Sequence, residues 1–154
     1  MMQLAHVVNA ILLRAHKDSI PISPMKLQKL VYLLYGAYLL ETGEPLFAER
    51  FEVWQYGPVV GDIYHAFKKY RDKPVREFMV DANGKYKTVD LVAKPTFTMQ
   101  FNRIWDKFSG KTGIELSNMT HYRGGAWYKA LSSRSPFIRD DDIREEMKVL
   151  LNAG

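Results

Sequence analysis

Cysteine is absent from the 154-residue chain. This absence excludes disulfides, thiolate metal sites and a cysteine nucleophile, and it fits a protein of the reducing cytosol. The longest nearly continuous apolar run lies within Leu30–Leu40 and is far shorter than the roughly 20 residues of a membrane-spanning helix. The amino-terminal segment lacks the basic start, apolar run and cleavage site of a signal peptide. We therefore expect a cytoplasmic protein without a membrane partner.

The chain also lacks the usual catalytic signatures. It contains no phosphate-binding Walker loop, no dinucleotide-binding glycine fingerprint, no His-Glu-x-x-His and no Gly-x-Ser-x-Gly. Its histidines are scattered along the sequence at positions 6, 16, 65 and 121. The sequence therefore predicts a protein that is not an enzyme, with no catalytic residue, no metal and no cofactor.

The composition is that of an ordinary folded domain. Hydrophobic residues make up 47% and charged residues 25% of the chain. No repeat, low-complexity tract or linker divides it, so we expect one domain over residues 1–154. The formal net charge is +5. Two interpretations of this charge stay open: an acidic partner, either nucleic acid or protein, or a contribution to solubility alone.

One helix, from Pro24 to about Thr42, is predicted at the centre of the fold. Ser23 is a suitable N-cap and Pro24 suits the first helical position. Gly43 is a natural C-terminal stop. The residues between are apolar on nearly every side, which is typical of a buried central helix.

The remaining pattern predicts a mostly α fold of the α+β class, a compact helical bundle with a short strand and a small β-hairpin. Apolar residues at helical spacing and capping signals, including a capping box at Thr112 and Glu115, indicate the other helices. The expected helices cover about 3–16, 58–70, 95–108, 112–121, a short segment around Trp127, and a last one from 140. The expected strand is 51–56 and the expected hairpin is 75–91.

The hairpin prediction depends on the Asn83-Gly84 dipeptide. Both residues tolerate the positive φ of a type I′ turn. A two-residue turn there would pair Phe78 with Val89 and would place Val80 and Leu91 on one face.

Two polar features have a structural and a functional interpretation. His121 is either a general base or a histidine bonded to backbone at a helix end, and the lack of a nearby nucleophile favours the second. The acidic run 140–142 is either a cation site or the first turn of a helix. The apolar stripe that follows it favours the helix.

Four blocks of residues carry a resemblance to a known family. They are Lys26–Gly36 (KLQKLVYLLYG), Phe51–Val60 (FEVWQYGPVV), Leu116–His121 (LSNMTH) and Gly125–Trp127 (GAW). In this order and spacing they resemble the Panacea domain of the SocA/GepA-like, phage-associated proteins. The resemblance implies an antitoxin that binds and neutralises a protein toxin encoded in the adjacent gene, by occlusion or by delivery to a host protease. It transfers no catalytic residue.

Two alternatives to the antitoxin stay open. The first is a DNA-binding regulator, motivated by the charge, although nucleic acid is the weaker expectation for a partner. The second is a phage protein that acts on a host or defence factor. The neighbouring gene would separate the antitoxin from both.

The candidate toxin-binding surface combines aromatic and basic residues, because tight interfaces depend on such anchors. The run of lysines and arginines between positions 68 and 76 is either a solvated helix end or part of this surface. The candidates are Trp54, Tyr56, Tyr64, His65, Lys68, Lys69, Arg71, Asn83 and Trp127.

Overall fold

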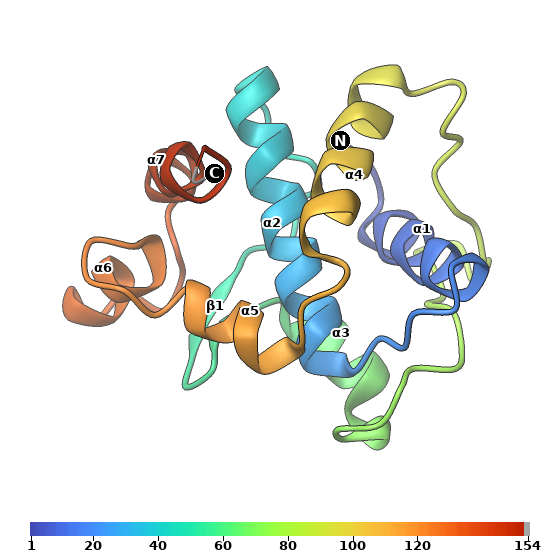
Figure 1. Ribbon diagram of the computed structural model, residues 1–154, viewed down its shortest axis with the longest axis horizontal. Coiled ribbons are helices and arrows are strands. Elements are labelled where there is room, and N and C mark those ends of the chain that lie inside the picture. The colour runs from blue at the N-terminus through green and yellow to red at the C-terminus, as the bar shows by residue number, and fades with distance from the viewer. Residues whose placement is uncertain (153–154) are drawn as a thin grey trace.

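The computed structural model describes residues 1–152 and arranges them around helix α2, Pro24–Thr42 (Figure 1). Thirteen of the 19 residues of α2 are buried. The helix packs against α1, Leu4–Lys17, α4, Pro95–Phe108, and α7, Asp140–Leu150. Figure 1 shows α1 and α4 on one side of α2 and α7 on the other. The prediction of a central buried helix is therefore confirmed.

The two ends of α2 follow their sequence signals. The Ser23 hydroxyl accepts a hydrogen bond from the Lys26 N–H at 3.2 Å, and Pro24 occupies the first turn. At the other end, Gly43 takes a left-handed φ of 74° and donates its N–H to Leu39 at 2.8 Å. These local bonds set the length of the helix on which the rest of the fold is packed.

The other helices complete a mostly α fold, as predicted. The stripes of α1 and α4 are buried, and Thr112 and Glu115 form the expected capping box. The acids 140–142 form the first turn of α7, where they complement the helix dipole. The remaining elements are α3 (Gly61–Phe67), the 3-10 helix η1 (Lys68–Tyr70), α5 (Gly113–Met119) and α6 (Ala126–Ser132).

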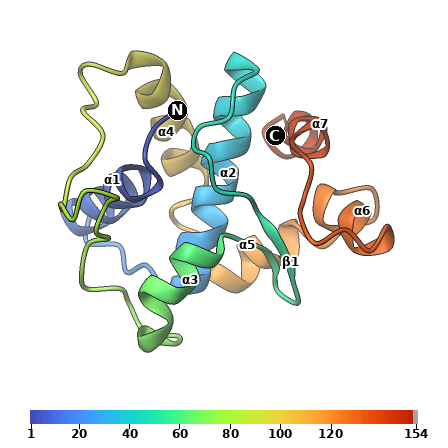
Figure 2. The same cartoon turned by 180° about the vertical axis from the view of Figure 1, so that it is seen from behind.

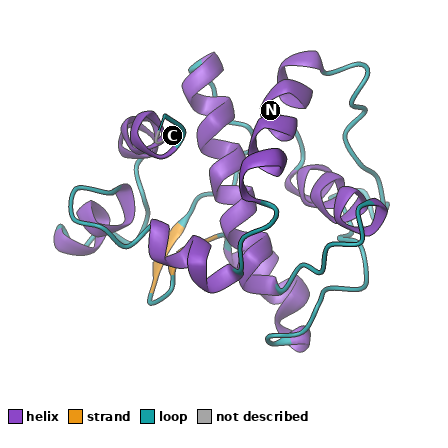
Figure 3. Ribbon diagram, in the orientation of Figure 1, coloured by secondary structure: helices purple, strands orange, loops and turns teal. Residues whose placement is uncertain are grey.

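The β-hairpin lies earlier in the chain than predicted. Strands β1, Glu52–Trp54, and β2, Gly57–Val59, pair antiparallel, with Trp54 opposite Gly57. Figure 3 shows these two short strands in orange, and Figure 2 shows the hairpin from behind. The predicted strand 51–56 contains β1 but ends too late, and the prediction of a helix from Pro58 is wrong, because Pro58 lies in β2.

The side chain of Gln28 explains why α3 begins only at Gly61. Its amide accepts from the Val60 N–H at 3.0 Å and donates to the Val60 carbonyl at 3.1 Å. This pair of bonds acts like one more strand partner and keeps the backbone extended through Val60. Pro58 therefore lies in a strand rather than in the first turn of a helix.

The segment predicted as a hairpin, 75–91, forms no strand. A turn closes where Asn83-Gly84 predicted one, with the Asp81 N–H bonded to the Lys85 carbonyl at 2.8 Å and Gly84 at φ 73°. The arms are separated by the buried side chain of Asn9. Its amide bonds both backbone groups of Met79 and the carbonyl of Lys87, at 2.7–2.9 Å.

One hydrophobic cluster connects the described residues, from Leu4 in α1 to Leu151 after α7. The loop that contains the Asn83-Gly84 turn lies over α1, where His6 contacts Asp81 at 2.7 Å (Figure 2). Within residues 1–152, every helix is too short or too polar to cross a membrane.

Candidate functional site

The turn between β1 and β2 is held by side chains from α5, α6 and the loop between them. Trp127 Nε1 donates to the Trp54 carbonyl at 2.7 Å, and Ser117 Oγ donates to the Tyr56 carbonyl at 2.5 Å. Between them, His121 Nε2 lies 2.9 Å from the Gln55 carbonyl. Three successive carbonyls of the turn are thus occupied by three side chains.

The second strand is held from α2. Lys29 Nζ donates to the Pro58 carbonyl at 2.9 Å, and Gln28 bonds Val60 as described above. A buried backbone group without a partner is costly, so these side chains fix the path of the hairpin as well as satisfying it. The hairpin is therefore a short but rigid support for the side chains that it exposes.

Gly57 is the point of closest approach beneath the turn. Its φ of 112° lies outside the region that side chains favour. A Cβ at this position would lie 2.7 Å from Thr120 Oγ1 and 3.0 Å from Lys29 Cε. The turn can approach the layer below it so closely only with glycine here.

Substitution of Gly57 by alanine is expected to destabilise the protein by about 2–4 kcal/mol, because strained backbone and steric overlap add. Gly124→Ala is the matched control. Gly124 also has a positive φ, of 87°, but its Cβ would meet nothing within 4 Å. Urea unfolding of both variants separates the two costs. Equal losses would show that the overlap at Gly57 contributes nothing.

A groove of about 320 Å³ lies between this hairpin, α3 and the start of α2, and we call it the hairpin groove. Trp54 and Tyr64 form one wall, with their ring centroids 4.6 Å apart. Tyr56 is 58% exposed and Tyr64 is 40% exposed, so both are open to a partner. The complete lining is Pro24, Met25, Gln28, Lys29, Trp54, Gln55, Tyr56, Val59, Ile63, Tyr64 and Arg71.

The charges of the groove lining are all positive. Lys29 and Arg71 line it, and the lining contains no aspartate or glutamate. Lys29 is 1% exposed, and its burial lowers the pKa of its amine to about 7. An apolar groove with buried positive charge is suited to binding, and its aromatic walls supply the type of side chain that anchors protein interfaces.

His121 forms the backbone contacts expected of a histidine at a helix end. Nδ1 lies 2.6 Å from the Ser117 carbonyl and Nε2 faces the Gln55 carbonyl, so both ring nitrogens are engaged. Its ring also packs against Trp127 at 4.2 Å. Within residues 1–152, no group of three or more histidine, aspartate or glutamate side chains could hold a metal ion.

Comparison with known proteins identifies the family. The model of the family described as "Antitoxin SocA-like, Panacea domain" matches residues 27–128. This chain belongs to that family. The matched region includes the hairpin, the groove lining apart from Pro24 and Met25, and the four blocks that carried the resemblance apart from Lys26.

A curated relative agrees with this assignment. The chain is 43% identical over 124 residues to "Antitoxin SocA" of Caulobacter vibrioides (strain NA1000 / CB15N). The aligned region covers 79% of this chain and 66% of the relative, slightly under two thirds of that protein's own length. The search of solved structures returned no match.

The blocks typical of the Panacea domain meet around the hairpin. Lys29 comes from the first block, Pro58 from the second, His121 from the third and Trp127 from the fourth, and each takes part in anchoring the turn. In this Panacea domain, therefore, residues of the four blocks fix the conformation of the hairpin. The signal that could have found this arrangement is the pair of polar residues, 28 and 29, inside an otherwise apolar helix.

Four of the predicted site residues meet at the hairpin groove: Trp54, Tyr56, Tyr64 and Arg71. Trp127 is buried beneath the hairpin and supports Trp54. The other candidates lie outside the groove lining. His65 faces a different hollow, beside Asp81, and Lys69 forms an ion pair with Glu77. Lys68 is exposed on η1, and Asn83 lies in the turn over α1.

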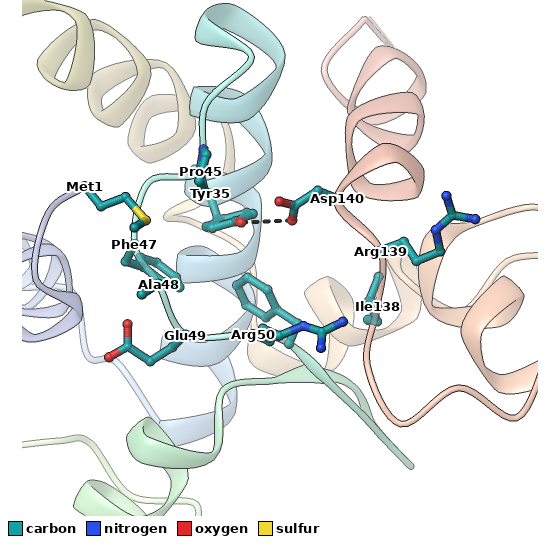
Figure 4. A pocket seen from close by; sticks show the side chains of 11 residues that line it. Met1, Tyr35, Pro45, Phe47, Ala48, Glu49, Arg50, Ile138, Arg139 and Asp140 are labelled. Carbon is teal, nitrogen blue, oxygen red and sulfur yellow. Dashed lines mark hydrogen bonds between the residues drawn. The ribbon is translucent and has the colours of Figure 1, made fainter.

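A larger pocket of about 440 Å³ was not predicted (Figure 4). It lies beside the start of α7, and Figure 4 shows Tyr35 reaching Asp140, a hydrogen bond of 2.9 Å. Its charged lining contains both signs, with Glu49 and Asp140 against Arg50 and Arg139. The charges that line this pocket thus balance, whereas the charges that line the hairpin groove are all positive.

Proposed function

We propose that this Panacea domain is an antitoxin that binds and neutralises a protein toxin through the hairpin groove. Membership of the SocA-like antitoxin family supports the role. The observation that supports the location is the exposed pair Tyr56, in the hairpin, and Tyr64, in α3, beside Trp54. Hydrogen bonds from side chains hold the backbone carbonyls of the turn that carries Tyr56.

Rigidity matters to this proposal because ordering a loop on binding reduces affinity. The backbone around Tyr56 is already fixed by Ser117, His121 and Trp127. Aromatic side chains add large contact areas with few rotatable bonds. A groove of this kind can bind tightly without a large interface.

We further propose that the toxin is the product of the adjacent gene and that one domain, residues 1–154, binds it in the cytosol without a cofactor or catalysis. Neutralisation by occlusion and delivery to a host protease are both compatible with this groove. Nucleic acid has no place in the proposal, because the groove is walled by apolar and aromatic side chains and one lysine of the basic run is paired with Glu77.

The test is co-expression with the adjacent gene and measurement of binding to a purified, inactive form of its product. Tyr56→Ala and Tyr64→Ala are each expected to weaken binding by about 30-fold, as interface anchors do. Their double variant is expected to lose growth rescue. Tyr56→Ala should leave the thermal unfolding transition unchanged because its side chain is exposed, and Tyr64→Ala should lower it only by the loss of the ring contact with Trp54.

Tyr86→Ala is the matched control. Tyr86 is 67% exposed but belongs to the loop over α1, away from the groove. The Tyr86→Ala variant should bind the toxin and restore growth like the wild-type protein. Full rescue by the Tyr56/Tyr64 double variant, or loss of rescue by Tyr86→Ala, would place the toxin surface elsewhere.

A further inference from the structure

The amine of Lys29 has fewer partners than it has protons. An ammonium carries three N–H donors. Among the described residues, the Pro58 carbonyl is the one acceptor that Lys29 reaches, and no carboxylate pairs with it. Such a buried cation is costly unless it is paired, and the residue that carries this one is part of the lining of the hairpin groove.

The groove is also small. Its 320 Å³ is at the low end of ligand pockets, which suits a single large side chain rather than a whole helix. The rings of Trp54 and Tyr64, in contact with each other, form one wall together with Ile63, and the cations of the groove are Lys29 and Arg71. Both shape and charge therefore specify what can fill it.

We propose that the hairpin groove takes an acidic segment of the protein toxin, with one aromatic side chain packed against the wall of Trp54 and Tyr64 and an adjacent carboxylate paired with Lys29. Arg71, which is exposed at the groove, adds long-range attraction for the same acidic segment. This inference rests on the proposed function and adds to it the chemistry that the toxin must present.

Proton uptake should accompany binding. With the groove empty, burial holds the pKa of Lys29 near 7, and a carboxylate beside the amine favours its charged form. Affinity should therefore fall as the pH rises through 7 and above. The other titratable groups around Lys29 are His121, across Gly57, and the phenols of Tyr56 and Tyr64 that share the groove.

A pair of small probes tests the inference without the toxin. 3-(Indol-3-yl)propionate carries an aromatic ring and a carboxylate, and its primary amide has the same shape without the charge. Binding is followed by NMR shifts of the backbone amides of the groove. We expect the acid to bind the wild type about tenfold more tightly than the amide at pH 6.5, with a smaller preference at pH 8.5.

Lys29→Met keeps the apolar stem and should remove most of the preference for the acid, leaving the part that Arg71 supplies. Lys26→Met is the matched control. Lys26 is the other buried lysine of α2, but its amine donates to the Ser109 carbonyl at 2.5 Å, away from the groove. The Lys26→Met variant should retain the preference for the acid over the amide. NMR spectra of both variants report whether the fold is intact.

Equal binding of acid and amide to the wild type, absence of any shift in the groove, or a preference that is undiminished in Lys29→Met would overturn this inference. None of these results would affect the toxin-binding test, which depends on Tyr56 and Tyr64. Conversely, failure of that test would leave the probe result standing and would place the acidic ligand in another protein.

Discussion

Replacement of Leu34 by aspartate is expected to abolish cooperative folding. Leu34 lies in the middle of α2 and is 1% exposed, in contact with the cluster that connects α1 to α7. A carboxylate there has no described partner and would lose its hydration, a cost of several kcal/mol at least. That cost is comparable with the whole free energy of unfolding of a typical domain, about 5–15 kcal/mol.

Leu13→Asp is the control for the new charge itself. Leu13 is also a helical leucine, in α1, but it is 47% exposed. It should remain folded, with a change of about 0.5 kcal/mol. Circular dichroism during urea unfolding measures both variants, and Leu34→Ala, expected to lose about 2–5 kcal/mol, calibrates the site. A soluble Leu34→Asp variant with a cooperative transition would contradict the central role of α2.

The predictable part of this fold is the part with local signals. Ser23, Pro24 and Gly43 mark the ends of α2 because each acts on backbone groups within four residues of itself. The stripes of α1 and α4 are equally local, since helical spacing alone places them on one face.

The errors arise where one buried amide replaces a strand partner. Asn9 is 1% exposed and bonds the two arms of the loop 75–91, so those arms cannot pair directly. Gln28 does the same for Val60 and delays the start of α3. Turn propensity near Asn83 was correct but could not reveal a side chain about 75 positions away that enters between the arms.

The candidate site was predictable in its exposed half. Aromatic and basic residues close together in sequence led to Trp54, Tyr56, Tyr64 and Arg71, which line one groove. The buried half of the site was not predictable, because Lys29 belongs to α2, and the apolar pattern of that helix indicates only that it is part of the core. A lysine inside such a helix marks either a paired charge or a site, and only the three-dimensional arrangement shows that it borders a groove.

A second buried charge has a structural role that can be measured. Glu146 of α7 accepts hydrogen bonds from the hydroxyl of Tyr32 in α2 and from the Ala126 N–H of α6 at 3.3 Å. It also faces the hydroxyl of Tyr122. One carboxyl group of α7 thus connects the central helix α2, the start of α6 and the loop before α6.

Loss of this group by Glu146→Ala is expected to destabilise the protein by about 3–5 kcal/mol, because buried donors on Tyr32 and Ala126 lose their acceptor and a cavity forms. The neighbouring Glu145→Ala is the matched control. Glu145 is exposed and pairs with Lys148 one helical turn away, so its loss should stay within about 0.5 kcal/mol. Similar losses for both variants would contradict a connecting role for Glu146.

The pH dependence of Glu146→Gln separates the charge from the hydrogen bonds. Burial raises the pKa of the Glu146 carboxyl above its ordinary value, although its donors act in the opposite direction. A raised pKa contributes stability below the unfolded value, and that contribution is lost as the pH rises through the folded value. Glutamine does not titrate. The stability of the wild type relative to Glu146→Gln should therefore decrease from pH 4 upward, and a difference that grows with pH over this range would show that the hydrogen bonds of the ionised carboxylate outweigh its desolvation.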